Sequence, residues 1–145
     1  MDKEIQCFAE QISEKIRKKM KATVLRNPDI LPYTSIDGHF KDNKGDICKW
    51  TNGFWPGILW LMYMDTKDSI YKEIAEHTER TLDGAFCKFD GLHHDVGFMW
   101  HISSGLNYRL TGNKKSRIRT LLAANLLMGR YNCLLYTSDA ADDLT

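Results

Sequence analysis

The chain has 145 residues, a common size for a single domain, with 43% hydrophobic residues and a formal net charge of +1. This composition excludes an intrinsically disordered chain, and the near-neutral charge provides no basic field for nucleic acid. The N-terminal residues lack the apolar stretch of a secretory signal, and no window approaches the roughly 18 apolar residues of a membrane span. We therefore expect a cytoplasmic protein that binds neither nucleic acid nor membranes.

Helical periodicity dominates the N-terminal segment. Apolar residues recur at every third or fourth position from Ile5 to Val24, which predicts an amphipathic helix over residues 3–26. The sequence Asn27-Pro28-Asp29 ends this helix, because the residue before a proline disfavours helical dihedrals. Residues 30–49 contain proline, glycine and scattered polar side chains, so we expect a long irregular loop there.

Four further helices are predicted after this loop. The second spans about residues 54–64 with Pro56 in its first turn, and the third begins at Asp68 or Ser69 and runs to Phe86. The remaining two cover about residues 96–110 and 114–128. We expect the last helix to bury its apolar residues: Ile118, Leu121, Leu122, Leu126 and Leu127. Because no alternating stretch of strand length is present, the predicted fold class is all-α, built from antiparallel helix pairs joined by short turns.

The cysteines give no sign of a metal centre. Cys7, Cys48, Cys87 and Cys133 are far apart and form no C-x-x-C pair, which argues against a structural zinc site and requires no disulfide framework. We expect reduced thiols and no bound cofactor or metal.

The last dozen residues break the pattern of the rest of the chain. Residues 134–145 show no core periodicity and resemble a translated sequencing-adapter read-through, the alternative being an authentic acidic tail. On the first interpretation residues 133–145 are a non-native tail, and the natural protein continues beyond Cys133.

The segment Gly91-Leu-His-His-Asp-Val-Gly-Phe-Met-Trp100 holds the strongest candidate for chemistry. Asp95 follows two imidazoles at the start of a predicted helix, where it serves as a proton-transferring carboxyl, as a helix N-cap, or as both. Because consecutive side chains diverge on helices and strands, we expect His93 and His94 to face different ways. A metal site is disfavoured, since the run lacks the i, i+4 spacing of two ligands on one helix face.

A second informative segment is Trp50-Thr-Asn-Gly-Phe-Trp-Pro-Gly-Ile-Leu-Trp60. Trp55 and Trp60 fall within a predicted helix and are expected in the core. Trp50 precedes the helix, where an indole is able to stack on a sugar ring and donate its N–H. For Asn52, capping of the helix is the favoured interpretation.

Together the two segments resemble the unsaturated glucuronyl hydrolases, glycoside hydrolase family 88. The first is similar to the family stretch W-T-x-G-F-W-x-G-x-L-W, and His93-His-Asp-Val-Gly-Phe98 is similar to its H-H-D-[IV]-G-F signature. The resemblance covers nearly all of residues 1–132. It implies that these residues are the N-terminal part, about five helices, of a single (α/α)6-barrel catalytic domain.

The resemblance also implies a reaction. Enzymes of this family release a 4,5-unsaturated uronic acid from the non-reducing end of oligosaccharides produced by polysaccharide lyases. They hydrate the vinyl-ether double bond: a carboxylic acid protonates C4, water adds at C5, and the resulting hemiketal opens. A related possibility is an unsaturated rhamnogalacturonyl hydrolase, and a different class is a helical carbohydrate-binding or interaction module without catalysis.

For individual residues, the resemblance makes Asp95 one of the two essential aspartates of the family. It places His94 beside Asp95 in the pocket and Trp50 at the sugar-binding wall. The second essential aspartate, the principal acid/base, has no counterpart here, and three aspartates of the final segment fit no part of its motif: Asp139, Asp142 and Asp143. Activity of this polypeptide on its own is therefore not expected.

Overall fold

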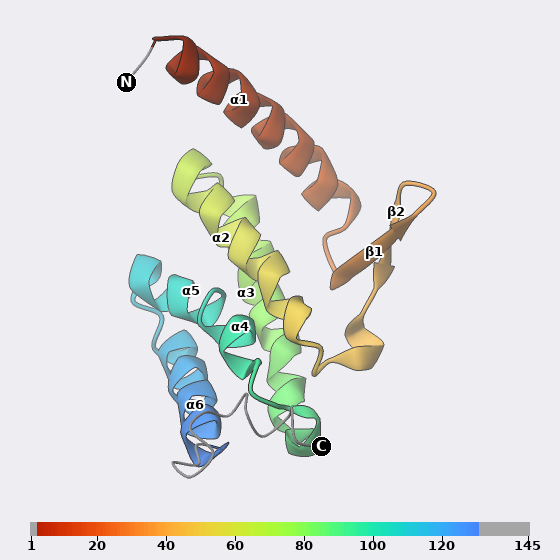
Figure 1. Ribbon diagram of the computed structural model, residues 1–145, viewed down its shortest axis with the longest axis vertical. Coiled ribbons are helices and arrows are strands. Elements are labelled where there is room, and N and C mark those ends of the chain that lie inside the picture. Colours follow the sequence, from red (N-terminus) through yellow and green to blue (C-terminus); the bar gives the residue numbers. More distant parts are fainter. Residues whose placement is uncertain (1–2, 131–145) are drawn as a thin grey trace.

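The computed structural model describes residues 3–130, and these are mostly helical, as predicted (Figure 1). The described helices are α1 (Lys3–Arg26), α2 (Phe54–Thr66), α3 (Ser69–Phe86), α4 (Val96–Trp100), α5 (Ser104–Thr111) and α6 (Lys114–Arg130). Within this part of the chain, no helix is both long and apolar enough to cross a bilayer. The predictions made for Cys133 and for the aspartates of the final segment fall outside the described residues.

Two antiparallel helix pairs, α2 with α3 and α5 with α6, form the body of the fold (Figure 1). The α2–α3 turn is tight because Lys67 adopts a left-handed conformation with φ 58° and Asp68 caps α3. The carboxylate of Asp68 accepts a hydrogen bond from the backbone N–H of Ile70 at 3.2 Å, which confirms the predicted cap. Gly112, with φ 73°, turns the chain between α5 and α6.

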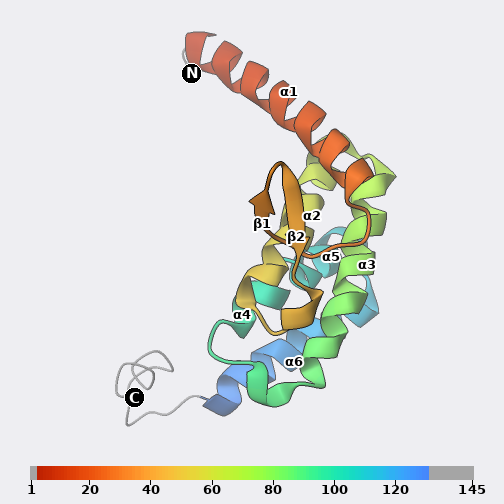
Figure 2. The ribbon, with the colours of Figure 1, turned by 90° about the vertical axis from the view of Figure 1, so that its right-hand side faces the viewer.

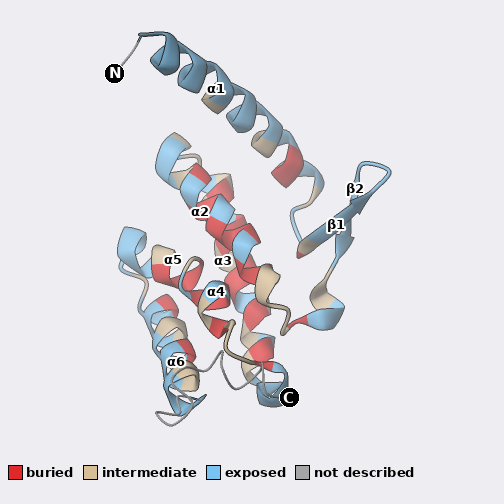
Figure 3. Cartoon of the chain, viewed as in Figure 1, coloured by how far each residue is buried: buried red, intermediate tan, exposed pale blue. Residues whose placement is uncertain are grey.

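Helix α3 contributes to two apolar clusters that together form the core. Near its N-terminus, Tyr71 and Ala75 pack with buried residues of α2, including Leu59 and Trp60. Near its C-terminus, Leu82 belongs to a second cluster whose other members include Leu92, Val96, Met99 and Trp100. Burial is therefore concentrated in the α2–α5 region, whereas α1 is largely exposed (Figure 3).

The segment predicted as an irregular loop contains a β-hairpin. Strands β1 (Pro32–Ile36) and β2 (His39–Asp42) pair antiparallel, joined by Asp37 and Gly38 with φ values of 49° and 78°. Two consecutive residues with positive φ are the geometry of a two-residue hairpin turn, for which Asp-Gly is a preferred sequence. The prediction of an irregular loop was wrong here, because Asp37-Gly38 favours the tight turn that lets the two strands pair.

The predicted helix over residues 96–110 is interrupted between α4 and α5. At the interruption the hydroxyl of Ser103 donates to the carbonyl of Met99, one turn earlier. A serine hydroxyl that bonds to the backbone competes with the helical hydrogen bonds and permits a bend. The bend directs Ser104 into the interior, where it is fully buried.

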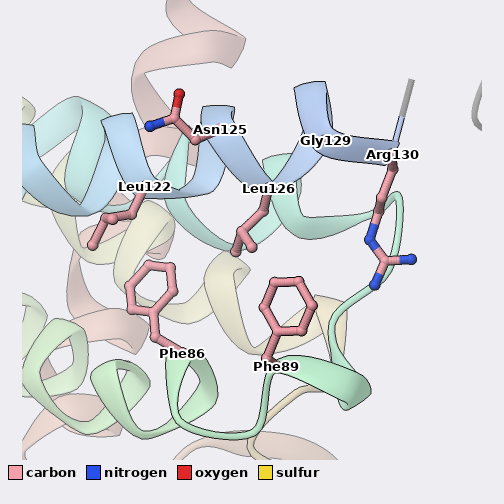
Figure 4. A pocket seen from close by; sticks show the side chains of 7 residues that line it. All are labelled: Phe86, Phe89, Leu122, Asn125, Leu126, Gly129 and Arg130. Carbon is pink, nitrogen blue, oxygen red and sulfur yellow. The ribbon is translucent and has the colours of Figure 1, made fainter. Parts of the chain in front are cut away.

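The apolar face predicted to be buried on α6 is largely uncovered. Ile118, Leu121 and Leu122 are 56%, 47% and 45% exposed, because among the described elements α6 packs mainly against α4 and α5 on one side. An apolar groove of about 570 Å³ runs between the C-terminal end of α3 and α6 (Figure 4). It is lined by Phe86, Phe89, Leu122, Asn125, Leu126, Gly129 and Arg130.

Helix α1 projects away from the body and also carries an uncovered apolar stripe (Figure 2). Ile5, Phe8 and Ile16 are 59%, 65% and 49% exposed. Contiguous apolar surface larger than a few hundred Å² promotes association of soluble chains, so we expect the chain to self-associate as its concentration rises. Phe8→Glu is expected to weaken this association in sedimentation velocity, whereas Gln11→Glu, off the stripe, adds the same charge as a control. Equal association of both variants would show that the stripe is not responsible.

Candidate active site

The His93-His94-Asp95 turn joins the short 3-10 helix η3 (Phe89–Gly91) to α4. It is held by Leu92, only 2% exposed, whose carbonyl accepts a hydrogen bond from the guanidinium of Arg130. The carbonyl of His93 accepts from Val96 N–H at 3.1 Å. The turn is therefore anchored on both sides, by the core and by the end of α6.

Asp95 occupies the N-cap position of α4, but its side chain makes no capping hydrogen bond. The carboxylate instead lies between the two imidazoles. Its Oδ2 is 3.4 Å from Nδ1 of His93, and its Oδ1 is 3.5 Å from Nε2 of His94. The side chain of Asp95 is 23% exposed, so a proton-transferring carboxyl remains accessible to a small molecule.

The expectation that His93 and His94 diverge is wrong. That rule applies to residues in helices and strands, whereas these two precede α4 in an irregular turn, where backbone dihedrals differ from residue to residue. Both rings consequently approach the same carboxylate, with their centroids 5.2 Å apart. The ligand-type atoms of the three residues lie within 4.8 Å of one another, so a metal ion is a geometric possibility at this turn.

Trp50 opens the 3-10 helix η2 (Trp50–Gly53) and is partly exposed, unlike Trp55 and Trp60, which are 7% and 0% exposed as predicted. The ring centroid of Trp50 lies 5.6 Å from that of Phe54 and 5.6 Å from that of Phe98. These rings form an aromatic cluster, defined here as Trp50, Phe54 and Phe98.

The aromatic cluster connects the two sequence segments in space. Phe98 lies one turn into α4, and its N–H donates to the carbonyl of Asp95 at 2.9 Å. Phe54 and Phe98 are 39% and 48% exposed, so the cluster presents apolar ring surface to solvent beside the Asp95 turn. The sequence indicates Trp50 alone as a sugar-binding aromatic, because the approach of Phe98 to Trp50 depends on how η2 packs against α4.

The prediction that Asn52 caps α2 was wrong. The cap residue is Gly53, without a side-chain bond, and Asn52 is 2% exposed. Its amide donates to the carbonyls of Asp46 and Ile47 at 2.9 and 3.2 Å, and its oxygen accepts from Asn43 at 2.9 Å. The residue therefore ties the loop after the hairpin to the start of η2, because three partners saturate a buried amide better than one cap bond.

Gly53 permits α4 to approach the start of α2. A Cβ added at this position would meet the carbonyl oxygen of Met99 at 2.6 Å, and also the Met99 Cα and the Phe98 carbonyl. These are backbone atoms, which cannot rotate away. The close approach brings the segment that holds Trp50 against the helix that follows Asp95.

Gly53→Ala is therefore expected to separate the two segments and to destabilise the fold by about 1–3 kcal/mol or more. Urea unfolding followed by circular dichroism measures the loss. Gly129→Ala serves as the control, because a Cβ there meets nothing within 4 Å. Unchanged stability in Gly53→Ala would contradict the close packing of η2 against α4.

Comparison with known proteins places this geometry in context. No known family model matches the chain. The chain is 38% identical over 104 residues to the unsaturated glucuronyl hydrolase of Bacillus sp. (strain GL1), covering 71% of this chain and 27% of that protein. It is 38% identical over 87 residues to the unsaturated chondroitin disaccharide hydrolase of Streptococcus pneumoniae, covering 59% of this chain and 22% of that protein.

Solved structures give a consistent result. The structure of the unsaturated glucuronyl hydrolase from Bacillus sp. GL1, described as responsible for glycosaminoglycan degradation, superposes with a TM-score of 0.66 at 30% identity, covering 77% of this chain and 29% of that one. A variant of the protein UGL, solved with the saccharide dGlcA-Glc-Rha-Glc, superposes with a TM-score of 0.67 at 29% identity, covering 77% of this chain and 29% of that one. The match is to part of the (α/α)6 barrel. The chain is thus homologous to part of the unsaturated glucuronyl hydrolases, and it spans 27% and 22% of the two curated relatives named above.

Proposed function

We propose that the chain supplies one wall of the active site of a hydrolase that removes a 4,5-unsaturated uronic acid from lyase-generated oligosaccharides by hydrating the vinyl-ether double bond. The observation that carries the proposal is the position of Asp95. Its carboxylate is partly exposed, is not used for capping, and lies within 3.5 Å of an imidazole nitrogen on each side. Homology to part of relatives named as unsaturated glucuronyl and unsaturated chondroitin disaccharide hydrolases supports the same assignment.

Hydration of the double bond requires a proton at one ring carbon and water at the next. Asp95 is suited to handle a proton, because its two oxygens face different imidazoles, which hold its orientation. In our proposal His94 contacts the substrate beside Asp95. The second carboxyl that the reaction needs is supplied by a part of the enzyme that this chain does not match.

The aromatic cluster is proposed to bind the sugar. A pyranose ring offers an apolar face of C–H groups, which packs on exposed aromatic rings, while the indole N–H is available for a hydroxyl. The exposed edges of Phe54 and Phe98 extend this surface from Trp50 toward the Asp95 turn.

Trp50→Ala is expected to weaken binding of an unsaturated disaccharide by about twofold to thirteenfold, because the loss of one aromatic stacking contact costs about 0.5–1.5 kcal/mol. Intrinsic tryptophan fluorescence of the chain, titrated with the disaccharide, measures the affinity. In the wild-type chain the change in emission on disaccharide binding is expected to come mainly from Trp50, because Trp55, Trp60 and Trp100 are buried away from the ligand.

For the Trp50→Ala variant, whose fluorescent reporter is lost, calorimetry replaces fluorescence. Phe89→Ala is the matched control, because Phe89 is also an exposed aromatic, 60% exposed, but lies outside the aromatic cluster. Equal affinity of Trp50→Ala and Phe89→Ala would exclude Trp50 from the sugar-binding wall.

The whole reaction is best tested in a chimera. Residues 3–130 of this chain replace the matched segment of the Bacillus sp. GL1 hydrolase, and turnover is followed as loss of the ultraviolet absorbance of the unsaturated uronate. We expect the chimera to hydrolyse the disaccharide. A folded chimera without turnover would contradict the proposal.

A further inference from the structure

The His93-His94-Asp95 turn brings three metal-ligand atoms to one point. Nδ1 of His93 and Nε2 of His94 lie 3.4 and 3.5 Å from the Asp95 carboxylate oxygens, and all three ligand atoms fall within 4.8 Å of one another. The three residues follow one another in the chain, so a single turn supplies all three ligand atoms. This cluster is denoted the HHD turn.

The separations within the HHD turn suit tetrahedral coordination. Metal–ligand bonds of about 2.0–2.1 Å at tetrahedral angles place neighbouring ligand atoms about 3.4 Å apart. Each imidazole nitrogen already lies near that spacing from one carboxylate oxygen: His93 Nδ1 is 3.4 Å from Oδ2, and His94 Nε2 is 3.5 Å from Oδ1 of Asp95. To bind one ion through a single Asp95 oxygen, the carboxylate and the two imidazoles must turn toward one another from separations within 4.8 Å. The histidine side chains are 43% and 27% exposed, so solvent leaves room for this rotation.

A backbone hydrogen bond to His93 competes with a metal ion. The backbone N–H of Asp95 donates to Nδ1 of His93, the atom that would bind the metal, at 3.4 Å. A hydrogen bond of that length is weak, so losing it costs little compared with a metal–imidazole bond. No fourth protein ligand is needed to complete the site, because three protein ligands and a water fill a tetrahedral coordination shell.

We propose that the HHD turn binds a borderline divalent cation, Zn²⁺ being the best fit, through Nδ1 of His93, Nε2 of His94 and one carboxylate oxygen of Asp95. Two imidazoles and a carboxylate are the ligand types that suit Zn²⁺ rather than Mg²⁺ or Ca²⁺, which take oxygen ligands. Occupation would engage the Asp95 carboxylate and so inhibit hydrolysis. The inhibition rests on the proposed function, whereas the binding does not.

Cobalt substitution tests the binding without any enzyme assay. Co²⁺ titrated into the full 145-residue chain, without an affinity tag, is expected to give the intense visible absorption of a tetrahedral ion, and Zn²⁺ is expected to displace it stoichiometrically. The absorption reports each bound ion whether or not chains associate.

Variants separate the HHD turn from other ligands. His94→Gln and Asp95→Asn are each expected to lower Co²⁺ affinity by more than about tenfold. His77→Gln is the matched control: His77 is 45% exposed and contacts Asp29 at 2.7 Å, a histidine–carboxylate pair with a single imidazole. Cys7→Ser and Cys87→Ser remove exposed thiols. Absence of a tetrahedral spectrum, equal affinity of His94→Gln and His77→Gln, or loss of binding in the serine variants would each overturn the proposal.

Discussion

Asp95→Asn is expected to lower turnover of an unsaturated disaccharide by about 10²–10⁴-fold in the chimera that carries residues 3–130 of this chain. Asparagine preserves the size of the side chain and its place between His93 and His94, but an amide can neither release nor accept a proton as a carboxyl does. Because the Asp95 side chain makes no capping bond to α4, the substitution leaves the helix start intact. The measurement is the initial rate of loss of ultraviolet absorbance.

The control for this variant is Asp90→Asn, which changes an exposed aspartate five positions earlier in the same connecting segment. Its rate is expected to equal that of the parent chimera. Circular dichroism melts of both variants establish that they fold alike. Undiminished turnover in Asp95→Asn would remove Asp95 from the mechanism, and an equal loss in both variants would point to disturbance of the turn.

Glu79→Ala is expected to be the most destabilising single change, at about 3–5 kcal/mol. Glu79 lies on α3, is 0% exposed, and joins three other helices. Its carboxylate accepts hydrogen bonds from Trp60 Nε1 at 3.0 Å, Ser104 Oγ at 3.0 Å, Asn107 Nδ2 at 3.1 Å and Ser116 Oγ at 2.7 Å. A guanidinium nitrogen of Arg119 lies 3.6 Å away.

The size of the effect follows from what the substitution leaves behind. Alanine would strand several buried donors without an acceptor and would remove the buried carboxylate opposite Arg119. The guanidinium stays charged, because hydrogen bonds from Arg119 to Asp83 raise its pKa above the usual value. Four helices, α2, α3, α5 and α6, would lose their shared polar contact at the same time.

Urea unfolding of Glu79→Ala measures this loss against Glu73→Ala, an exposed glutamate on the same helix. Glu73→Ala is expected to change stability by less than about 0.5 kcal/mol. Glu79→Gln tests the role of the carboxylate charge. Its amide N–H groups would face the side chains that donate to the Glu79 carboxylate, so this variant is also expected to lose stability. A loss below about 1 kcal/mol for Glu79→Ala would show that the buried network contributes little beyond packing.

The helices were predictable because local sequence determines them. The apolar repeat and the Asn-Pro stop predicted α1 over residues 3–26, and the structure has the same bounds. The Asp68 cap was predicted because a side chain that accepts a bond two residues on needs no distant partner. Burial of these helices was not predictable in the same way, because the apolar stripe on α1 repeats at the helical period and is nevertheless exposed. Periodicity predicts which residues share a face, but it does not supply the surface that covers that face.

Two of the wrong predictions, for Asn52 and for residues 96–110, share one physical cause, which is competition between the expected helical hydrogen bonds and partners elsewhere in the fold. Asn52 was expected to cap α2, but three partners in the preceding loop bind its amide. Residues 96–110 were expected to form one helix, but the bend at Ser103 directs Ser104 to Glu79, 25 positions away. Each outcome depends on which groups the fold brings close, and the spacing of residues along the chain does not specify that.

By itself the sequence determined the helical class, most helix bounds, the family motifs and Asp95 as the candidate for chemistry, because these depend on residue type and short-range spacing. Tertiary structure alone decided that both imidazoles face Asp95, that Phe98 joins Trp50 in one aromatic cluster, and that Glu79 is buried among hydrogen-bond donors. Irregular turns and long-range packing set these contacts. In such turns no fixed period relates a residue's number to the direction of its side chain.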